Sequence, residues 1–149
     1  MSAGKLCKRN VITTRRECTI LEAAQLMRKH HVGCLVITEE KSGIVEPVGI
    51  VTDRDIVMEV IAEDLGLNEV NVGDIMSYAL LKVQESDSII ETAQRMRARG
   101  VRRVPVVSDS CELIGIIALD DILELLSEEL SMLARLTSRE AEQEHNKRA

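Results

Sequence analysis

The strongest candidate for chemistry is a short polar stretch where a β-rich run gives way to a helical pattern: Thr52, Asp53, Arg54 and Asp55. The Asp55 carboxylate can accept hydrogen bonds from both vicinal hydroxyls of a ribose. The Thr52 hydroxyl, together with free backbone N–H groups at the start of a helix, suits a phosphate. The same Thr-x-x-Asp spacing is that of a capping box, which stabilises a helix with no ligand bound. The spacing alone therefore supports a ligand site and a structural cap equally.

Positive charge is concentrated in one segment of an acidic chain. The formal net charge is -6, yet five arginines fall close together: Arg95, Arg97, Arg99, Arg102 and Arg103. Arg95 and Arg99 are four residues apart on one helix face, and we interpret them as solvated. Arg102 and Arg103 stand just before a β-rich run, in which successive residues point to opposite faces. We therefore expect one of these two, preferably Arg103, to face a cleft.

The sequence offers little support for a metal site or for catalysis. His30 and His31 are adjacent at a helix end, so they cannot easily converge on one ion, and Cys34 supplies no second ligand pair at standard spacing. No cysteine stands in a recognisable arrangement with a histidine and an acid. We expect no metal ligands and no catalytic residues, and hence a protein that is not an enzyme.

Composition excludes several further classes. The 149 residues suffice for one compact domain or two small intertwined halves. With one Tyr and no Phe or Trp, the chain lacks the aromatic platform on which single-stranded nucleic acid stacks, and its net charge has the wrong sign for a phosphate backbone. The apolar runs are far shorter than the roughly 20 residues of a membrane helix. The absence of a signal-like N-terminus and of CxxC pairs predicts a cytoplasmic protein with reduced thiols.

The chain contains an internal repeat. Residues 5–38 align without a gap on residues 74–107, and residues 48–58 align on residues 114–124. The change of offset between the two blocks reflects a longer loop in the first copy, around residues 41–47. Two copies favour a pseudo-symmetric pair over an open solenoid, which needs three or more.

Each copy has the same order of predicted elements. Capping-box patterns at Thr19/Glu22 and Ser88/Glu91 start helices with apolar residues at helical spacing, and Gly100 is well placed to end the second one. The predicted strands are residues 11–12, 35–38 and 48–51 in the first copy and residues 80–81, 104–107 and 113–117 in the second. Further helices follow from about residue 53 to residue 62 and from about residue 120 onward. The pattern predicts an α+β fold of two β-α-β-β-α repeats packed as one module.

Residues 5–126 resemble a tandem pair of cystathionine-β-synthase (CBS) domains. The motifs that carry the resemblance, in the correct order, are "EAAQLM", "GIVTDRDI", "VGDIMS" and "VRRVPVV". The resemblance implies a CBS repeat at residues 5–62, a connector at 63–73, a second repeat at 74–126 and a C-terminal helix or polar tail at 127–149. It also implies a disk-like homodimer that binds an adenosine-containing ligand in clefts between the repeats and controls a separate effector protein.

The resemblance also implies roles for individual residues. In the family pattern Gly-x-x-Thr-x-x-Asp the Asp holds ribose and the Thr contacts phosphate, which assigns these roles to Asp55 and Thr52. The second copy keeps Asp121 but has Ala118 at the hydroxyl position. Because one polar contact is missing there, we expect unequal sites, with the Thr52/Asp55 site the tighter.

Further site residues follow from position within the repeats. The residues before the strand at 104–107 often reach phosphates in the family, which supports Arg102 and Arg103. With no aromatic available, adenine would rest on aliphatic and backbone groups, for which Ile12, Thr13 and Cys34 are candidates; ordinary core packing explains each of the three as well.

The C-terminal segment has an apolar seam at heptad-like spacing: Leu119, Leu123, Leu126, Leu130 and Leu133. The seam is consistent with a helical dimer interface and, equally, with intramolecular packing. Residues 137–149 are polar and predict a frayed helix or a disordered tail.

Two functions are consistent with these patterns. The first is a regulatory module that senses AMP, ADP, ATP or an S-adenosyl compound, with the nucleotide as regulatory ligand and not as cofactor. The alternative is a scaffolding dimerisation module whose nucleotide clefts are vestigial.

Overall fold

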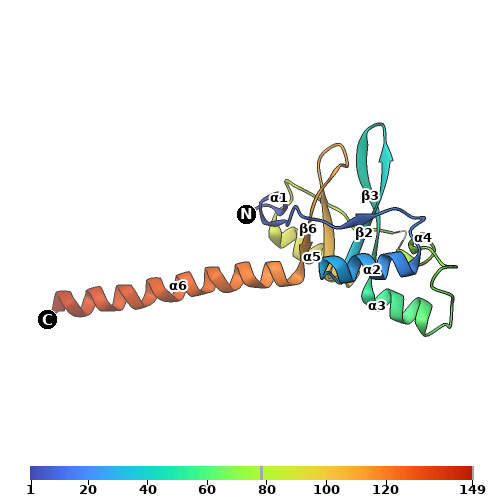
Figure 1. Ribbon diagram of the computed structural model, residues 1–149. Helices are drawn as coiled ribbons and strands as arrows, with labels where there is room; N and C mark the ends of the chain where they lie inside the picture. Colours follow the sequence, from blue (N-terminus) through green and yellow to red (C-terminus); the bar gives the residue numbers. More distant parts are fainter. Residues whose placement is uncertain (78, 149) are drawn as a thin grey trace.

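A computed structural model describes residues 1–77 and 79–148 (Figure 1). It confirms the mixed α+β architecture of two similar halves, each with a three-stranded sheet. The elements of the first half are α1 (Ala3–Leu6), β1 (Thr13–Thr14), α2 (Ile20–His30), β2 (Cys34–Lys41), β3 (Ile44–Thr52), α3 (Asp53–Ile56) and the π-helical turn η1 (Val57–Ile61). The second half contains α4 (Val72–Ile75), β4 (Val83–Gln84), α5 (Ile89–Arg99), β5 (Arg103–Val107), β6 (Leu113–Ala118) and α6 (Leu119–Arg148).

The two sheets share one topology. In each sheet the first, two-residue strand pairs in parallel with the second strand, which pairs antiparallel with the third. The registers are equivalent too: Cys34 lies opposite Thr52, and Arg103 lies opposite Ala118. The repeat seen in the sequence is therefore a repeat of structure.

Local signals account for the ends of the main helices. Thr19 and Glu22 form the reciprocal capping box at the start of α2, whereas Ser88 caps α5 only by accepting the Glu91 N–H at 3.1 Å. Both helices end on a residue in the left-handed region, which is His31 (φ 54°) in the first copy and Gly100 (φ 65°) in the second.

Each half has its own core, and the segment that opens each repeat packs on the core of the other. Ala3 and Cys7, around α1, belong to the second core with Val83, whereas Val72 and Met76, around α4, belong to the first. Backbone hydrogen bonds also join each opening segment to the other half. Ala3 N–H donates to the Asp87 carbonyl at 2.8 Å, and Val72 N–H donates to the Cys18 carbonyl at 2.8 Å. The two packing units therefore interlock and do not coincide with continuous stretches of sequence.

The short strands lie slightly later than predicted. The predictions at residues 11–12 and 80–81 are wrong by a few residues, because the strands are Thr13–Thr14 and Val83–Gln84. The apolar pairs that suggested strands are instead the lead-in to them: Ile12 and Leu81 pack against the two cores. Pairing with the neighbouring strand, and not the apolar pair itself, sets where each strand begins.

The helices that follow β3 and β6 differ from each other, although the sequence predicts a similar helix after each of these strands. The helix predicted from residue 53 to residue 62 is α-helical only to Ile56 and continues as the π-helical turn η1. Helix α6 runs without a break to Arg148 and projects away from the body of the molecule (Figure 1). The sequence left a frayed helix or a disordered tail open for residues 137–149, and the structure shows a helix through Arg148. Within the described residues, none of the helices combines the length and apolar character needed to cross a membrane.

Candidate functional site

A cavity of about 450 Å³ brings the two halves of the candidate site together. The first half contributes residues from the end of β3 and from α3, namely Ile50, Thr52, Asp53, Arg54 and Asp55. The second half contributes residues before β4 and between α5 and β5: Ser77, Ala79, Leu80, Leu81, Arg99, Gly100, Val101, Arg102 and Arg103. The polar stretch and the arginine segment, which are far apart in the chain, thus line one cavity.

Thr52 and Asp55 form the capping box, and their geometry leaves groups available to a ligand. The Thr52 N–H donates to Asp55 Oδ2 at 2.9 Å, and the Asp55 N–H donates to Thr52 Oγ1 at 3.1 Å. Among residues 1–77 and 79–148, no partner occupies Asp55 Oδ1. The Thr52 hydroxyl accepts in this pair, so its own hydrogen remains available for donation. The cap and the ligand site are therefore compatible functions of the same two side chains.

Asp53 and Arg54 lie exposed at the same end of the cavity. The Asp53 N–H donates to the Gly33 carbonyl at 2.9 Å, and Asp53 Oδ1 accepts the Arg54 N–H at 2.8 Å. These bonds fix the backbone at the start of α3 and place the Asp53 carboxylate beside the loop before β2.

Both Arg102 and Arg103 line the cavity, so the expectation that only one would face it is wrong. Strand β5 begins at Arg103, and Arg102 lies before it, where the alternation of a strand does not apply. Arg99, interpreted from the sequence as a solvated residue, also lines the cavity, and its guanidinium donates to the Ala79 carbonyl. Arg95 instead pairs with Asp87 at 3.1 Å.

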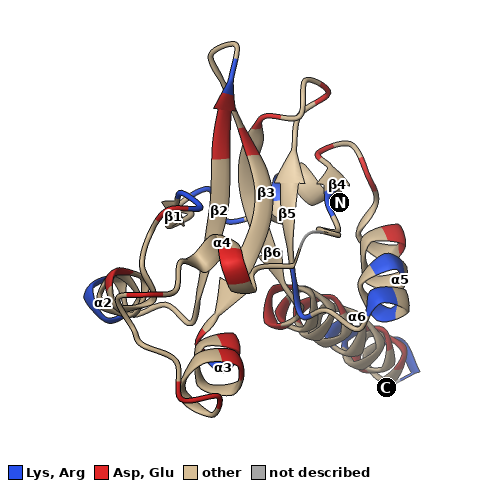
Figure 2. Ribbon diagram, turned by 90° about the vertical axis from the view of Figure 1, so that its right-hand side faces the viewer, with Lys and Arg blue, Asp and Glu red and all other residues tan. Residues whose placement is uncertain are grey.

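The cavity carries a positive formal charge in an acidic protein. Four arginines (54, 99, 102 and 103) and two aspartates (53 and 55) line it, which gives +2. Helix α5 carries basic residues, and α3 begins with acidic ones (Figure 2). Guanidinium groups at this density favour an anion over a cation.

Four predicted site residues do not line this cavity: Ile12, Thr13, Cys34 and, in the second copy, Asp121. Ile12 packs against the first core, and Thr13 lines a separate open cavity near Glu22 and Leu26. Cys34 lies on β2 opposite Thr52. Burial raises the pKa of the Cys34 thiol, while the nearby Arg103 guanidinium acts in the opposite direction. Cys34 is therefore a neighbour of the site and not part of its wall.

Asp121 occupies the equivalent place in the second copy, outside this cavity. Its Oδ2 accepts the Ala118 N–H at 2.8 Å, and its Oδ1 pairs with the Lys8 ammonium at 3.0 Å. Only 8% of its side chain is exposed. The second carboxylate is thus already bound on both oxygens, unlike that of Asp55.

The lining residues that the sequence did not assign to this site are Ile50, Ser77, Ala79, Leu80, Leu81, Arg99, Gly100 and Val101. The internal repeat held a partial signal for them, because Leu81 aligns on Ile12, which was a candidate for adenine. The adenine contacts were sought in the first repeat, whereas Leu80, Leu81 and Val101, which line this cavity, come from the second.

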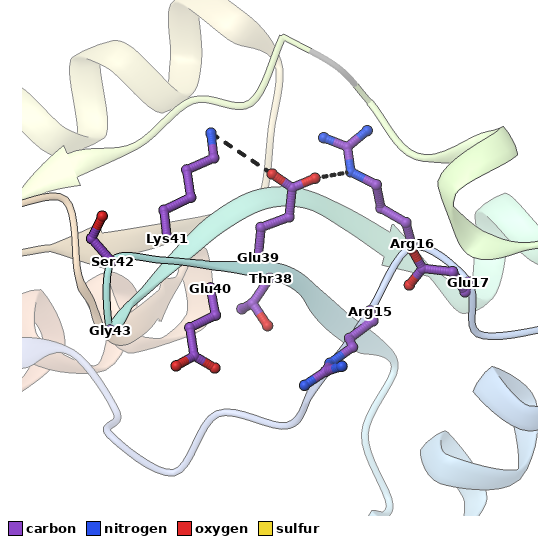
Figure 3. Close-up of a pocket in the computed structure, with 9 residues that line it drawn as sticks. All are labelled: Arg15, Arg16, Glu17, Thr38, Glu39, Glu40, Lys41, Ser42 and Gly43. Carbon is purple, nitrogen blue, oxygen red and sulfur yellow. Dashed lines mark ion pairs between the residues drawn. The ribbon is translucent and has the colours of Figure 1, made fainter.

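A second cavity, of about 550 Å³, lies beside the β2–β3 hairpin and is lined by residues 15–17 and 38–43 (Figure 3). Three of its charged groups are paired, because Glu39 contacts both Arg16 and Lys41. Because these pairs satisfy the central carboxylate, this cavity is a weaker candidate for a ligand. Among the described residues, no group of three or more His, Cys, Asp or Glu side chains is placed to hold a metal ion.

Comparison with known proteins identifies the family. The CBS domain family matches residues 3–62 and 72–128. "CBS domain-containing protein YhcV" of Bacillus subtilis is 35% identical over 112 residues, covering 75% of this chain and 76% of that protein. "Uncharacterized protein MK0525" of Methanopyrus kandleri is 39% identical over 125 residues, which are 84% of this chain but only 62% of that protein.

A solved structure agrees in fold. The CBS domain pair of protein MJ0100, in complex with 5′-methylthioadenosine and S-adenosyl-L-methionine, superposes with a TM-score of 0.75 at 26% identity, covering 87% of this chain and 98% of that one. The matched repeats, the relatives and the fold together show that the chain belongs to the CBS domain family, as a tandem CBS pair.

Proposed function

We propose that this CBS pair is a regulatory, non-catalytic module that binds an adenosine nucleotide in the cavity between its repeats and signals to a separate protein. The observation that carries the proposal is the meeting in one cavity of four arginines and Asp55, whose Oδ1 has no partner among the described residues. The MJ0100 pair, of the same fold, is described in complex with adenosine compounds.

Each part of a nucleotide finds a matching group. Asp55 Oδ1 is available to the ribose hydroxyls, and Arg102 and Arg103 can grip phosphate oxygens with their planar forks. The Leu80, Leu81 and Val101 side chains offer an apolar wall for adenine without aromatic stacking. The cavity charge favours AMP, ADP or ATP over S-adenosylmethionine, whose sulfonium would face the arginines.

The position of the cavity supports a regulatory role. A ligand there touches both repeats, including the segment that joins α4 to β4, and α4 is packed on the first core. A nucleotide would shift the arrangement of the repeats by as much as it prefers one arrangement over another. Asp55 Oδ1, which no other described residue contacts, argues against the alternative, a scaffold with vestigial clefts.

We also propose that the chain acts in the cytoplasm as a homodimer, with an effector protein as its regulated partner. Exposed apolar side chains on α6 support self-association: Leu123, Leu126, Leu130, Leu133 and Leu136 are each more than two-fifths exposed.

Calorimetric titration of AMP, ADP, ATP and S-adenosylmethionine tests the nucleotide proposal. We expect wild type to bind at least one adenine nucleotide and Asp55→Ala to bind it at least tenfold more weakly, a loss of about 1.4 kcal/mol. Asp74→Ala is the matched control. Asp74 accepts the Asn71 N–H at 2.9 Å as the same kind of cap on α4, and it does not line the cavity.

Two results would contradict the proposal. One is the absence of binding by folded, ligand-free wild type to all four compounds. The other is an equal loss in Asp55→Ala and Asp74→Ala, which would mean that the loss comes from a damaged helix cap and not from a lost ribose contact.

A further inference from the structure

The second copy repeats the Asp55 helix cap at Asp121, but a lysine stands near it where the first copy has a serine. In the repeat alignment Asp121 corresponds to Asp55, and Lys8 corresponds to Ser77. Ser77 and Asp55 both line the nucleotide cavity. At the equivalent place in the second copy, the Lys8 ammonium lies 3.0 Å from Asp121 Oδ1. In the second copy a side chain of the protein thus holds the carboxylate oxygen that, in the first copy, no described residue contacts.

The backbone holds Lys8 firmly in this place. Its N–H donates to the Ile116 carbonyl at 2.9 Å, and its carbonyl accepts the Ile116 N–H at 3.0 Å, so it forms a bridge with β6 just before Asp121. The preceding residue, Cys7, is anchored in the second core. The Lys8 stem therefore starts beside the carboxylate that its ammonium reaches.

The surroundings make Lys8 the natural counter-ion of Asp121. The positions that correspond to Arg102 and Arg103 are Gly33 and Cys34, which bring no positive charge. The hydrogen bond and charge of Asp121 raise the pKa of the Lys8 ammonium, with smaller contributions from Glu124 and Asp120. The Lys8 side chain is 71% exposed and that of Asp121 is 8% exposed, so the ion pair joins an exposed lysine to a buried carboxylate.

We propose that Lys8 is a built-in occupant of the second cleft: its ammonium takes the carboxylate oxygen needed for ribose, so that each chain binds one nucleotide, at Asp55, and not two. The inference rests on the proposed function and adds which cleft is used and which residue closes the other. Lys8 is a specificity-determining residue of the second cleft, and it does not touch the ligand of the first.

Adenosine titration of AMP-saturated protein tests the inference. AMP fills the Asp55 cavity, and adenosine offers ribose and adenine to the second cleft without a phosphate, which Asp120 and Asp121 would repel. We expect Lys8→Ser, which installs the residue of the first copy, to bind a further equivalent of adenosine at least tenfold more tightly than wild type does. Lys8→Met keeps the aliphatic stem without the ammonium, and we expect it to show a gain as well.

Two controls locate the effect. Lys5→Ser removes the same charge from the exposed face of α1, three residues earlier, and should behave as wild type. Asp121→Asn in the Lys8→Ser background should remove the gained binding. Circular dichroism of every variant establishes that it is folded.

The inference is overturned if AMP-saturated wild type binds adenosine as tightly as Lys8→Ser, if neither Lys8 variant gains binding, or if the gain persists with Asp121→Asn. Failure of the proposed function would look different, because wild type would not bind AMP. The adenosine titrations of wild type and the Lys8 variants without AMP would still test the role of Lys8.

Discussion

The exchange of a single hydroxyl between the two copies gives the sharpest test of how the cap and the site are combined. Thr52→Ala gives the first copy the residue of the second, and Ala118→Thr does the reverse. In the first copy Thr52 Oγ1 accepts the Asp55 N–H at 3.1 Å, while the Thr52 N–H bond to Asp55 Oδ2 does not depend on the hydroxyl. Thr52→Ala therefore removes one of the two bonds of the cap and leaves the other.

The expected size of the effect follows from that single bond. Loss of an N-cap hydroxyl costs about 0.5–2 kcal/mol, and because half of the box survives we expect about 1 kcal/mol for Thr52→Ala. For a chain of this size that corresponds to a fall in Tm of roughly 2–4 °C. Ala118→Thr should raise the free energy of unfolding by up to the same amount, since the Asp121 N–H gains an acceptor. Urea and thermal unfolding of the ligand-free proteins measure both changes.

The same pair separates stability from binding. If the Thr52 hydroxyl donates to phosphate, Thr52→Ala weakens AMP binding by roughly 2- to 12-fold, the equivalent of about 0.5–1.5 kcal/mol for one hydrogen bond. Ala118→Thr leaves AMP affinity unchanged, because Ala118 does not line the Asp55 cavity. A stability loss in Thr52→Ala with unaltered AMP affinity would refute the phosphate contact. If the free energy of unfolding changed in the same direction in Thr52→Ala and Ala118→Thr, the argument that the hydroxyl stabilises the helix cap would be refuted.

Two further predictions concern the helix ends and self-association. Gly100→Ala should destabilise the protein by about 1 kcal/mol, and His31→Gly should stabilise it by a similar amount. Both positions are left-handed (φ 65° and 54°), and only glycine adopts that region without cost. Urea unfolding measures both changes, and changes of the same sign in the free energy of unfolding would contradict the prediction. Leu130→Glu combined with Leu133→Glu should weaken the dimer in sedimentation velocity while leaving the free energy of unfolding of the monomer within about 0.5 kcal/mol, since these side chains are 70% and 57% exposed. An unchanged dimer would place the interface elsewhere.

The features that the sequence determined by itself are those that depend on neighbours a few residues away. The capping box at Thr19, the left-handed end at Gly100 and the Thr52/Asp55 pair all involve bonds across three or four residues. Such bonds form wherever the local chain is helical, so residue type and spacing suffice to predict them. The repeat added the order of elements, because two aligned copies of one pattern predict two copies of one fold.

The tertiary structure decided which of these residues meet. Asp55 and Arg103 line one cavity because each opening segment packs on the core of the other repeat, which places the residues before β4 and β5 of one half beside α3 of the other. No pattern within either repeat carries that information. For the same reason Arg99 joined the site, Ile12 and Thr13 did not, and Lys8 came to lie on Asp121. Spacing along the chain fixes contacts between near neighbours, whereas contacts between distant residues are selected by the burial of apolar surface in the assembled fold.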